Sequence, residues 1–120
     1  MPGNILAVTD EPSSGWYAVR CVFAMEGVSE DAERTFEERV TLWRAESHDE
    51  AIDRAETEAR DYATALALAE YVGLAQSYQL PDAPDDGVEV FSLLRDSDLA
   101  PSDYLDAFFD TGTKRQQKSP

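Results

Sequence analysis

The chain has 120 residues, which is enough for a single domain with a buried core. A hydrophobic fraction of 42%, including two Trp, five Tyr and five Phe, excludes wholesale disorder. Twenty-five acidic and ten basic side chains give a formal net charge of −15, which repels nucleic-acid phosphates and anionic lipids. We therefore expect no binding to nucleic acid or to a membrane, and attraction to basic proteins or cations.

The two ends of the chain differ in composition from its middle. Residues 1–15 are rich in Pro, Gly and Ser and are predicted to form a flexible lead, and residues 113–120 a flexible polar tail. Residues 16–112 are predicted to form a single α+β domain. No apolar run reaches the roughly 18–20 residues of a membrane span, and no basic region opens a secretory signal. We expect a bacterial or archaeal protein of the cytoplasm.

Two stretches near the start alternate in the manner of β-strands. Both faces of Trp16–Met25 are apolar apart from Arg20, which is typical of a central strand. Arg34–Glu46 follows a polar connection and is predicted to be its antiparallel neighbour. We expect Val40 and Leu42 of this second strand to face a core covered by a helix.

The next segment carries the clearest helix signal. Ser47 and Glu50 have the spacing of a capping box, which predicts a helix from His48 to about Leu68. Small and apolar residues recur along it at spacings of three and four, which indicates a structural helix packed closely against a sheet. This stripe consists of Ala51, Ile52, Ala55, Ala59, Tyr62, Ala63 and Leu66.

The remaining chain predicts two further strands and a second helix. Gly73 is predicted to mark a break, and a short strand around Gln76–Leu80 then ends at Pro81. Val88–Arg95 is predicted to be the fourth strand. Pro101 suits the first position of the last helix. The predicted order is β-β-α-β-β-α, an α+β fold in which a four-stranded antiparallel sheet has its helices packed on one face. The apolar side of the last helix consists of Tyr104, Leu105, Phe108 and Phe109.

Few residues have the chemistry of a catalytic or metal site. Cys21 is the single cysteine and lies in a strand pattern, where a free cysteine is usually a small buried hydrophobe. His48 is expected to be an exposed residue of the first helical turn, since a general base needs a nucleophile beside it. Asp82, Asp85 and Asp86 lack the spacing of an EF-hand loop and are interpreted as solvated turn residues. We expect no catalytic residues, no cofactor and no metal, and the sequence favours a protein that is not an enzyme.

One side of the predicted sheet is a candidate binding face. Alternation places Glu37, Arg39 and Trp43 of the second strand on the side away from Val40 and Leu42. Trp16 and Arg20 of the first strand are expected to lie on the same side. Trp and Arg are enriched in binding hot spots, so this face suits a protein partner or a second copy in a homodimer. The alternative is a plain solvated face with Glu–Arg pairs across strands. The candidate residues are Trp16, Arg20, Glu37, Arg39 and Trp43.

These features support two classes of function. The first is a small acidic, non-catalytic protein-interaction module acting through the open side of its sheet. The second is a small-ligand-binding domain or cryptic enzyme in which Arg20, Arg39 and Glu37 hold an anionic group. Paired arginines suit that role because they bind carboxylates and phosphates with bidentate hydrogen bonds.

Four segments, taken in order, resemble a known bacterial family. They are WYAVR, FEERVTLWRAES leading into DEAIDRAETEA, DGVEVFSLL and DYLDAFFDTG. Together they resemble the family called domain of unknown function 4288, over roughly Trp16 to Gly112, with a poorly matching stretch at Thr64–Ser77. The resemblance implies a small stand-alone bacterial protein, and it supplies no catalytic residues.

Overall fold

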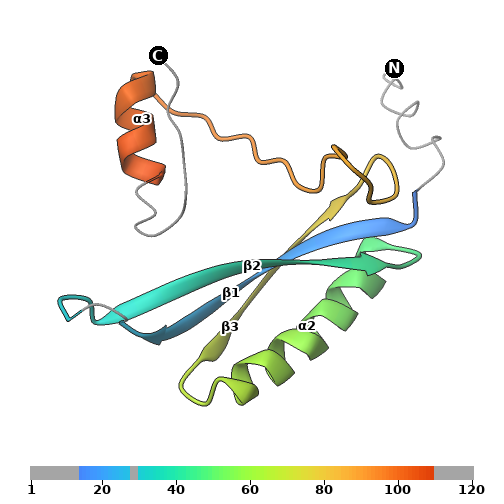
Figure 1. The fold of residues 1–120 in the computed structure, drawn as a ribbon, viewed down its shortest axis with the longest axis horizontal. Helices are drawn as coiled ribbons and strands as arrows, with labels where there is room; N and C mark the ends of the chain where they lie inside the picture. The colour runs from blue at the N-terminus through green and yellow to red at the C-terminus, as the bar shows by residue number, and fades with distance from the viewer. Residues whose placement is uncertain (1–13, 28–29, 110–120) are drawn as a thin grey trace.

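The computed structural model describes residues 14–27 and 30–109, so most of the predicted lead at 1–15 and all of the predicted tail at 113–120 lie outside the described residues. The described elements make an α+β fold with one antiparallel sheet, in which the strand order is β2-β1-β3 (Figure 1). The central position of β1 confirms the prediction from its two apolar faces. The elements are β1 (Trp16–Glu26), β2 (Arg34–Arg44), α2 (His48–Ala65), β3 (Glu70–Gln79) and α3 (Pro101–Phe108).

α2 covers one face of the sheet through its alanines. The stripe predicted from the sequence supplies the helix side of the core except for Leu66, which follows the helix and is 44% exposed, and the odd-numbered side chains of β1 supply the sheet side. Alanine has the smallest side chain that still packs, so the helix axis lies close to the strand. The buried residues of this layer are Ala51, Ala55, Ala59 and Ala63 of α2 and Tyr17, Val19, Cys21 and Phe23 of β1.

Local interactions determine where α2 begins and where it ends. The Ser47 hydroxyl accepts a hydrogen bond from the Glu50 N–H (3.1 Å), which confirms the predicted N-cap. The Glu50 carboxylate accepts from the N–H of Glu46 (2.7 Å), one residue earlier than a standard capping box requires. The helix ends at Ala65, earlier than predicted, and Ala67 then adopts a left-handed φ of 65° that turns the chain toward β3.

β3 is longer than the sequence predicts. The expected strand around Gln76–Leu80 is part of a strand that begins at Glu70, and Gly73 lies inside it rather than breaking it. Gly73 has a φ of 88°, which glycine adopts without steric cost, and the register with β1 shifts at this point. The glycine therefore marks a β-bulge. The strand ends at Gln79, and the N–H of the next residue, Leu80, donates to the carbonyl of Trp16 (2.9 Å).

The prediction of a fourth strand at Val88–Arg95 is wrong, because the sheet has three strands. Phe91 of this segment packs over the sheet instead of pairing beside it, with its ring centre 5.9 Å from that of Tyr78 and 4.9 Å from Cζ of Arg20. Alternating apolar residues favour an extended backbone but do not supply a strand to pair with. Pro81, which has no N–H to donate, is the second residue after β3, and the chain leaves the sheet edge there.

α3 also departs from the prediction. Pro101 stands in its first turn, as expected, but none of the helix residues is buried. Within the described part of the chain, α3 contacts neither the strands nor α2, and Figure 1 shows it standing apart from the sheet. The expectation that both helices pack on one face is therefore wrong for α3. Of the two described helices α2 alone packs on the sheet, and residues 14–27 and 30–109 place no helix on the opposite face.

Replacing Ala55 by leucine is expected to lower the free energy of unfolding by about 1–3 kcal/mol, because the side chain is 1% exposed and faces β1 without room for three more carbons. Urea unfolding measures this loss. The matched control is Ala65→Leu at an exposed position of the same helix, where we expect a change below about 0.5 kcal/mol. Equal losses at the two positions would contradict the close approach of α2 to the sheet.

Candidate functional site

The register between β1 and β2 determines which predicted site residues share a face. The buried odd-numbered residues of β1 lie opposite odd-numbered residues of β2, and opposite residues of antiparallel strands point to the same side. Glu37, Arg39 and Trp43 therefore lie on the side covered by α2. Trp16 and Arg20 lie on the other side. The expectation that all five residues form one face is wrong, since the structure divides them between the two faces.

Glu37, Arg39 and Trp43 lie on the covered side because β2 is an edge strand. Val40 and Leu42, which the sequence places in the core, are each 42% exposed on the side away from α2. α2 packs mainly on β1 and β3, so the covered side of β2 lies at the rim of the helix. Long amphipathic side chains fit a rim better than short aliphatic ones, because their stems pack while their polar ends reach water. Trp43 packs against the core there, and its Nε1 donates to Oγ1 of Thr41 (2.6 Å).

A polar network joins β2 to α2 on the covered side. Arg39 donates from Nη1 to Oε1 of Glu58 (2.7 Å) and from Nη2 to Oε2 (3.0 Å), and its guanidinium lies 3.8 Å from the centre of the Tyr62 ring. The Tyr62 hydroxyl donates to Oε1 of Glu37 (2.7 Å). Hydrogen bonding to Glu58 raises the pKa of Arg39, and hydrogen bonding to Glu37 raises the pKa of Tyr62. Arg39 and Glu37 thus fasten the helix to the sheet.

The three residues predicted to hold an anionic group do not meet. Both terminal nitrogens of Arg39 are engaged by Glu58, beneath the edge of α2. Arg20 lies on the opposite face, where Nη1 donates to Oε1 of Glu38 (3.2 Å) and Nη2 donates to Oε1 of Gln76. The paired-arginine geometry on which the second class of function depends is absent from this sheet.

Cys21 is a free, buried thiol beneath α2, in agreement with the prediction. Burial raises the pKa of Cys21, and the nearby carboxylates of Glu56 and Glu58 raise it further. Burial and a hydrogen bond to Glu56 likewise raise the pKa of Tyr71, whose hydroxyl donates to that carboxylate. A thiol held neutral in this way is a poor nucleophile.

His48 is exposed, as predicted, but it has partners that the sequence did not indicate. Its Nδ1 lies 2.8 Å from Oγ of Ser77, and its ring meets that of Tyr17 edge to face at 4.9 Å. A Ser–His contact is part of a catalytic triad only when a third group orients the imidazole. Among the described residues no carboxylate hydrogen-bonds this ring. The contact joins the start of α2 to β3.

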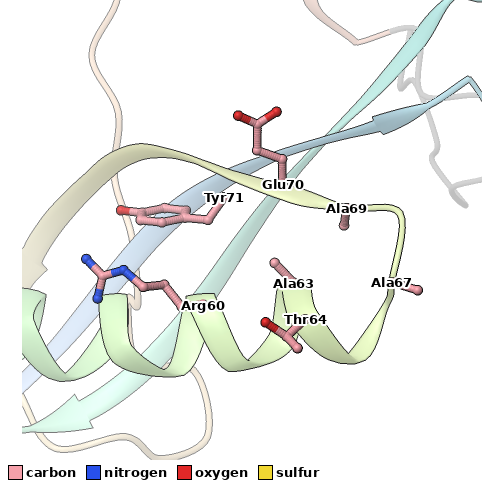
Figure 2. A pocket seen from close by; sticks show the side chains of 7 residues that line it. All are labelled: Arg60, Ala63, Thr64, Ala67, Ala69, Glu70 and Tyr71. Atoms are coloured by element: carbon pink, nitrogen blue, oxygen red, sulfur yellow. The ribbon is translucent and has the colours of Figure 1, made fainter.

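Two shallow hollows lie near the turn between α2 and β3. The larger has a volume of about 510 Å³, and the smaller, of about 340 Å³, is lined by the ends of β1 and β2 together with the same turn. In Figure 2, Arg60 lies along the Tyr71 ring while Glu70 points to the other side of the strand. The larger hollow lacks the convergent polar groups typical of ligand sites. It is lined by Arg60, Ala63, Thr64, Ala67, Ala69, Glu70 and Tyr71.

The face of the sheet opposite α2 is a large exposed apolar surface. We call it the open face, and it consists of the even-numbered residues of Trp16–Glu26, Arg34–Arg44 and 70–78. The exposed apolar side chains of this face lie on the two edge strands, β2 and β3, and exposed apolar surface of this kind marks interaction sites in soluble proteins. Its exposed large hydrophobic side chains are Phe36, Val40, Leu42, Val72 and Leu74.

Charge on the open face is balanced, in contrast to the rest of the molecule. Three arginines and three glutamates stand on it, whereas α2 on the covered side carries six acidic and two basic residues. A chain of net charge −15 therefore has one face that is locally neutral. The charged residues of the open face are Arg20, Arg34, Arg44, Glu26, Glu38 and Glu70.

A double-mutant cycle on Arg39 and Glu58 is expected to give a coupling energy of about 0.5–1 kcal/mol, because the pair is bidentate and only about a third of each side chain is exposed. Urea unfolding of wild type, both single alanine variants and the double variant measures it. The matched cycle on Arg20 and Glu38 should give less than about 0.5 kcal/mol, since Glu38 is mostly exposed. A larger coupling for the second pair would contradict this ranking.

Cys21 is expected to react with a thiol reagent at pH 8 far more slowly in the folded protein than in urea, because burial raises its pKa. The same shift lowers the free energy of unfolding as the pH rises above about 8.5, where the thiol of the unfolded chain loses its proton first. Colorimetric thiol titration and unfolding at several pH values measure the two effects. Equal reaction rates with and without urea would contradict the burial of this thiol.

Residues 14–27 and 30–109 contain no metal-binding cluster and no membrane-spanning helix. No three His, Cys, Asp or Glu side chains in this range are placed to hold a metal ion. No helix in the same range is long and apolar enough to cross a membrane.

Comparison with known proteins assigns a family and no activity. No curated protein and no solved structure matches the chain. A family model matches residues 16–92, which include all three strands, α2 and Phe91, and which leave α3 outside. On this match the chain belongs to the family described as Domain of unknown function (DUF4288), the family that its sequence segments resemble.

Proposed function

We propose that the protein is a non-catalytic binding module whose open face docks another polypeptide chain. The observation that carries this proposal is the presence of five exposed large hydrophobic side chains on the sheet face opposite α2, which no helix of the described residues covers. Trp16 and Arg20, two of the residues selected from the sequence, lie on that face. Arg39 and Glu37 are engaged in holding α2 to the sheet.

The open face supplies enough apolar surface for binding of moderate strength. Completing the burial of each half-exposed side chain contributes about 1 kcal/mol, so the five together contribute about 5 kcal/mol before the cost of association. Strands of 11 residues at the usual rise and spacing give a projected area of about 37 Å by about 14 Å, or about 500 Å². A standard interface covers about 800 Å² on each partner. A partner of standard size therefore extends beyond the sheet.

The neutral charge of the open face influences which partners fit it. A strongly basic protein is attracted to the acidic surface around α2, whereas a partner that docks on the sheet meets equal numbers of arginine and glutamate side chains. Exposed charge pairs contribute little affinity but suppress wrong orientations. Docking on the open face is therefore expected to depend mainly on apolar contact.

The double variant Val40→Asp/Leu42→Asp is expected to abolish binding to the open face, because it places two carboxylates in the centre of the apolar surface. The matched control is Leu66→Asp/Leu68→Asp, which makes the same change at two exposed leucines in the turn after α2. Affinity capture from cells that produce the protein compares the two variants with wild type, and circular dichroism verifies that all three are folded. The proposal fails if all three forms retain the same proteins, its own copies included, in the same amounts.

A further inference from the structure

The segment after Leu80 carries most of the remaining exposed apolar surface. Fourteen large hydrophobic side chains are exposed in the described part of the chain; five lie on the open face and seven lie between Val90 and Phe109. We call residues Val88–Phe109 the arm. One chain thus holds two apolar surfaces, whose twelve large side chains remain exposed in the described part of the chain. The seven residues of the arm are Val90, Leu93, Leu94, Leu99, Leu105, Phe108 and Phe109.

The arm is anchored at its start and free of the sheet at its end. Phe91 lies over Tyr78 and Arg20 of its own open face. From there the chain leads outward to α3, which contacts none of the described strands (Figure 1). The end of the arm is a small unit of its own, in which Arg95 donates from Nη1 to the Tyr104 hydroxyl (2.9 Å) and lies 4.1 Å from the Phe108 ring centre. A formed helix is therefore presented away from its own sheet.

The charges of the arm suit the open face and no other part of the sheet. The arm carries five acidic residues and one basic residue, Arg95. α2 also has an excess of acidic residues, so the covered side of the molecule repels the arm. The open face is neutral overall and carries Arg34 and Arg44, which suit the aspartates of the arm. Both the apolar pattern and the charge pattern of the arm thus match this face.

We propose that α3 of a second copy covers the open face, in a reciprocal exchange across a twofold axis. The inference rests on the proposed function and names its partner as this same chain. A helix on the open face completes a sheet covered on both sides, the usual solution for a sheet with two apolar faces. α3 is eight residues and about 12 Å long, so the contact reaches the size of a stable dimer interface only when Leu93, Leu94 and Leu99 of the arm contact the open face beside it, and the exchange makes this contact twice. A single contact of α3 with its own sheet gives half of that.

The exchange has a characteristic dependence on salt. Each copy carries a net charge of −15, so two copies repel one another at low ionic strength. Salt screens this repulsion and leaves the apolar contact intact, so the dimer is expected to strengthen between about 0.05 M and about 0.5 M NaCl. Binding of a basic protein to the acidic surface weakens over the same range.

The experiment is sedimentation equilibrium of the full chain and three double variants, each verified as folded by circular dichroism. We expect a dimer for wild type and for the control Leu66→Asp/Leu68→Asp. We expect monomers for the face variant Val40→Asp/Leu42→Asp and for the arm variant Leu105→Asp/Phe108→Asp. The dimer dissociation constant of each variant is expected to be at least tenfold above that of wild type. An equimolar mixture of the face and arm variants should recover a heterodimer, because one intact arm then meets one intact face.

The other outcomes overturn the inference in separate ways. A wild-type chain that stays monomeric at all concentrations and salt levels excludes the exchange. A dimer that survives the arm variant but not the face variant means that two open faces pack on each other, which contradicts the role of α3 and leaves the proposed function in place. A dimer that survives both variants rejects the open face as the dimer contact, and the capture experiment above then decides the proposed function on its own.

Discussion

The close packing of the α2 alanines on the central strand is the constraint on which the rest of the structure depends. Once the odd-numbered side chains of β1 lie beneath the helix, strand alternation and antiparallel register determine the face of every residue in β2 and β3. The polar network of Arg39 and the exposure of Val40 follow from that one choice. Because α2, with its 18 residues, covers one face of the sheet, the same contact leaves the open face without a helix among the described residues.

The sequence predicts those parts of the fold whose signals are local. The N-cap at Ser47, the alanine stripe and the two apolar faces of Trp16–Glu26 depend on residues within one element, and all of them are found in the structure. The predictions for Gly73 and Val88–Arg95 are wrong because their outcome depends on neighbouring strands. A glycine in a strand terminates it or forms a bulge depending on the neighbouring strand, and an alternating segment forms a strand only if an edge accepts it.

The sequence predicts the orientation of the candidate residues on the central strand but not of those on the edge strand. Trp16 and Arg20 belong to the central strand, whose orientation the helix determines, and they lie on the open face as expected. Arg39 and Trp43 belong to an edge strand with apolar residues on both sides, so hydrophobicity alone did not orient them. The role of Arg39 depends on Glu58, which is 19 residues away and has the pattern of a solvated helix surface. No local signal in the sequence connects the two.

The acidity of the chain and its bare sheet face form a consistent design. Exposed strands and apolar patches promote unselective association, and a large net charge opposes it by repulsion between copies. That repulsion acts at long range and in all orientations, whereas apolar burial acts only on contact and only where the surfaces fit. In the proposed function, the net charge of −15 therefore weakens most encounters, and binding is favourable only when a fitting surface contacts the neutral apolar face. In that role the charge provides selectivity, and the open face provides affinity.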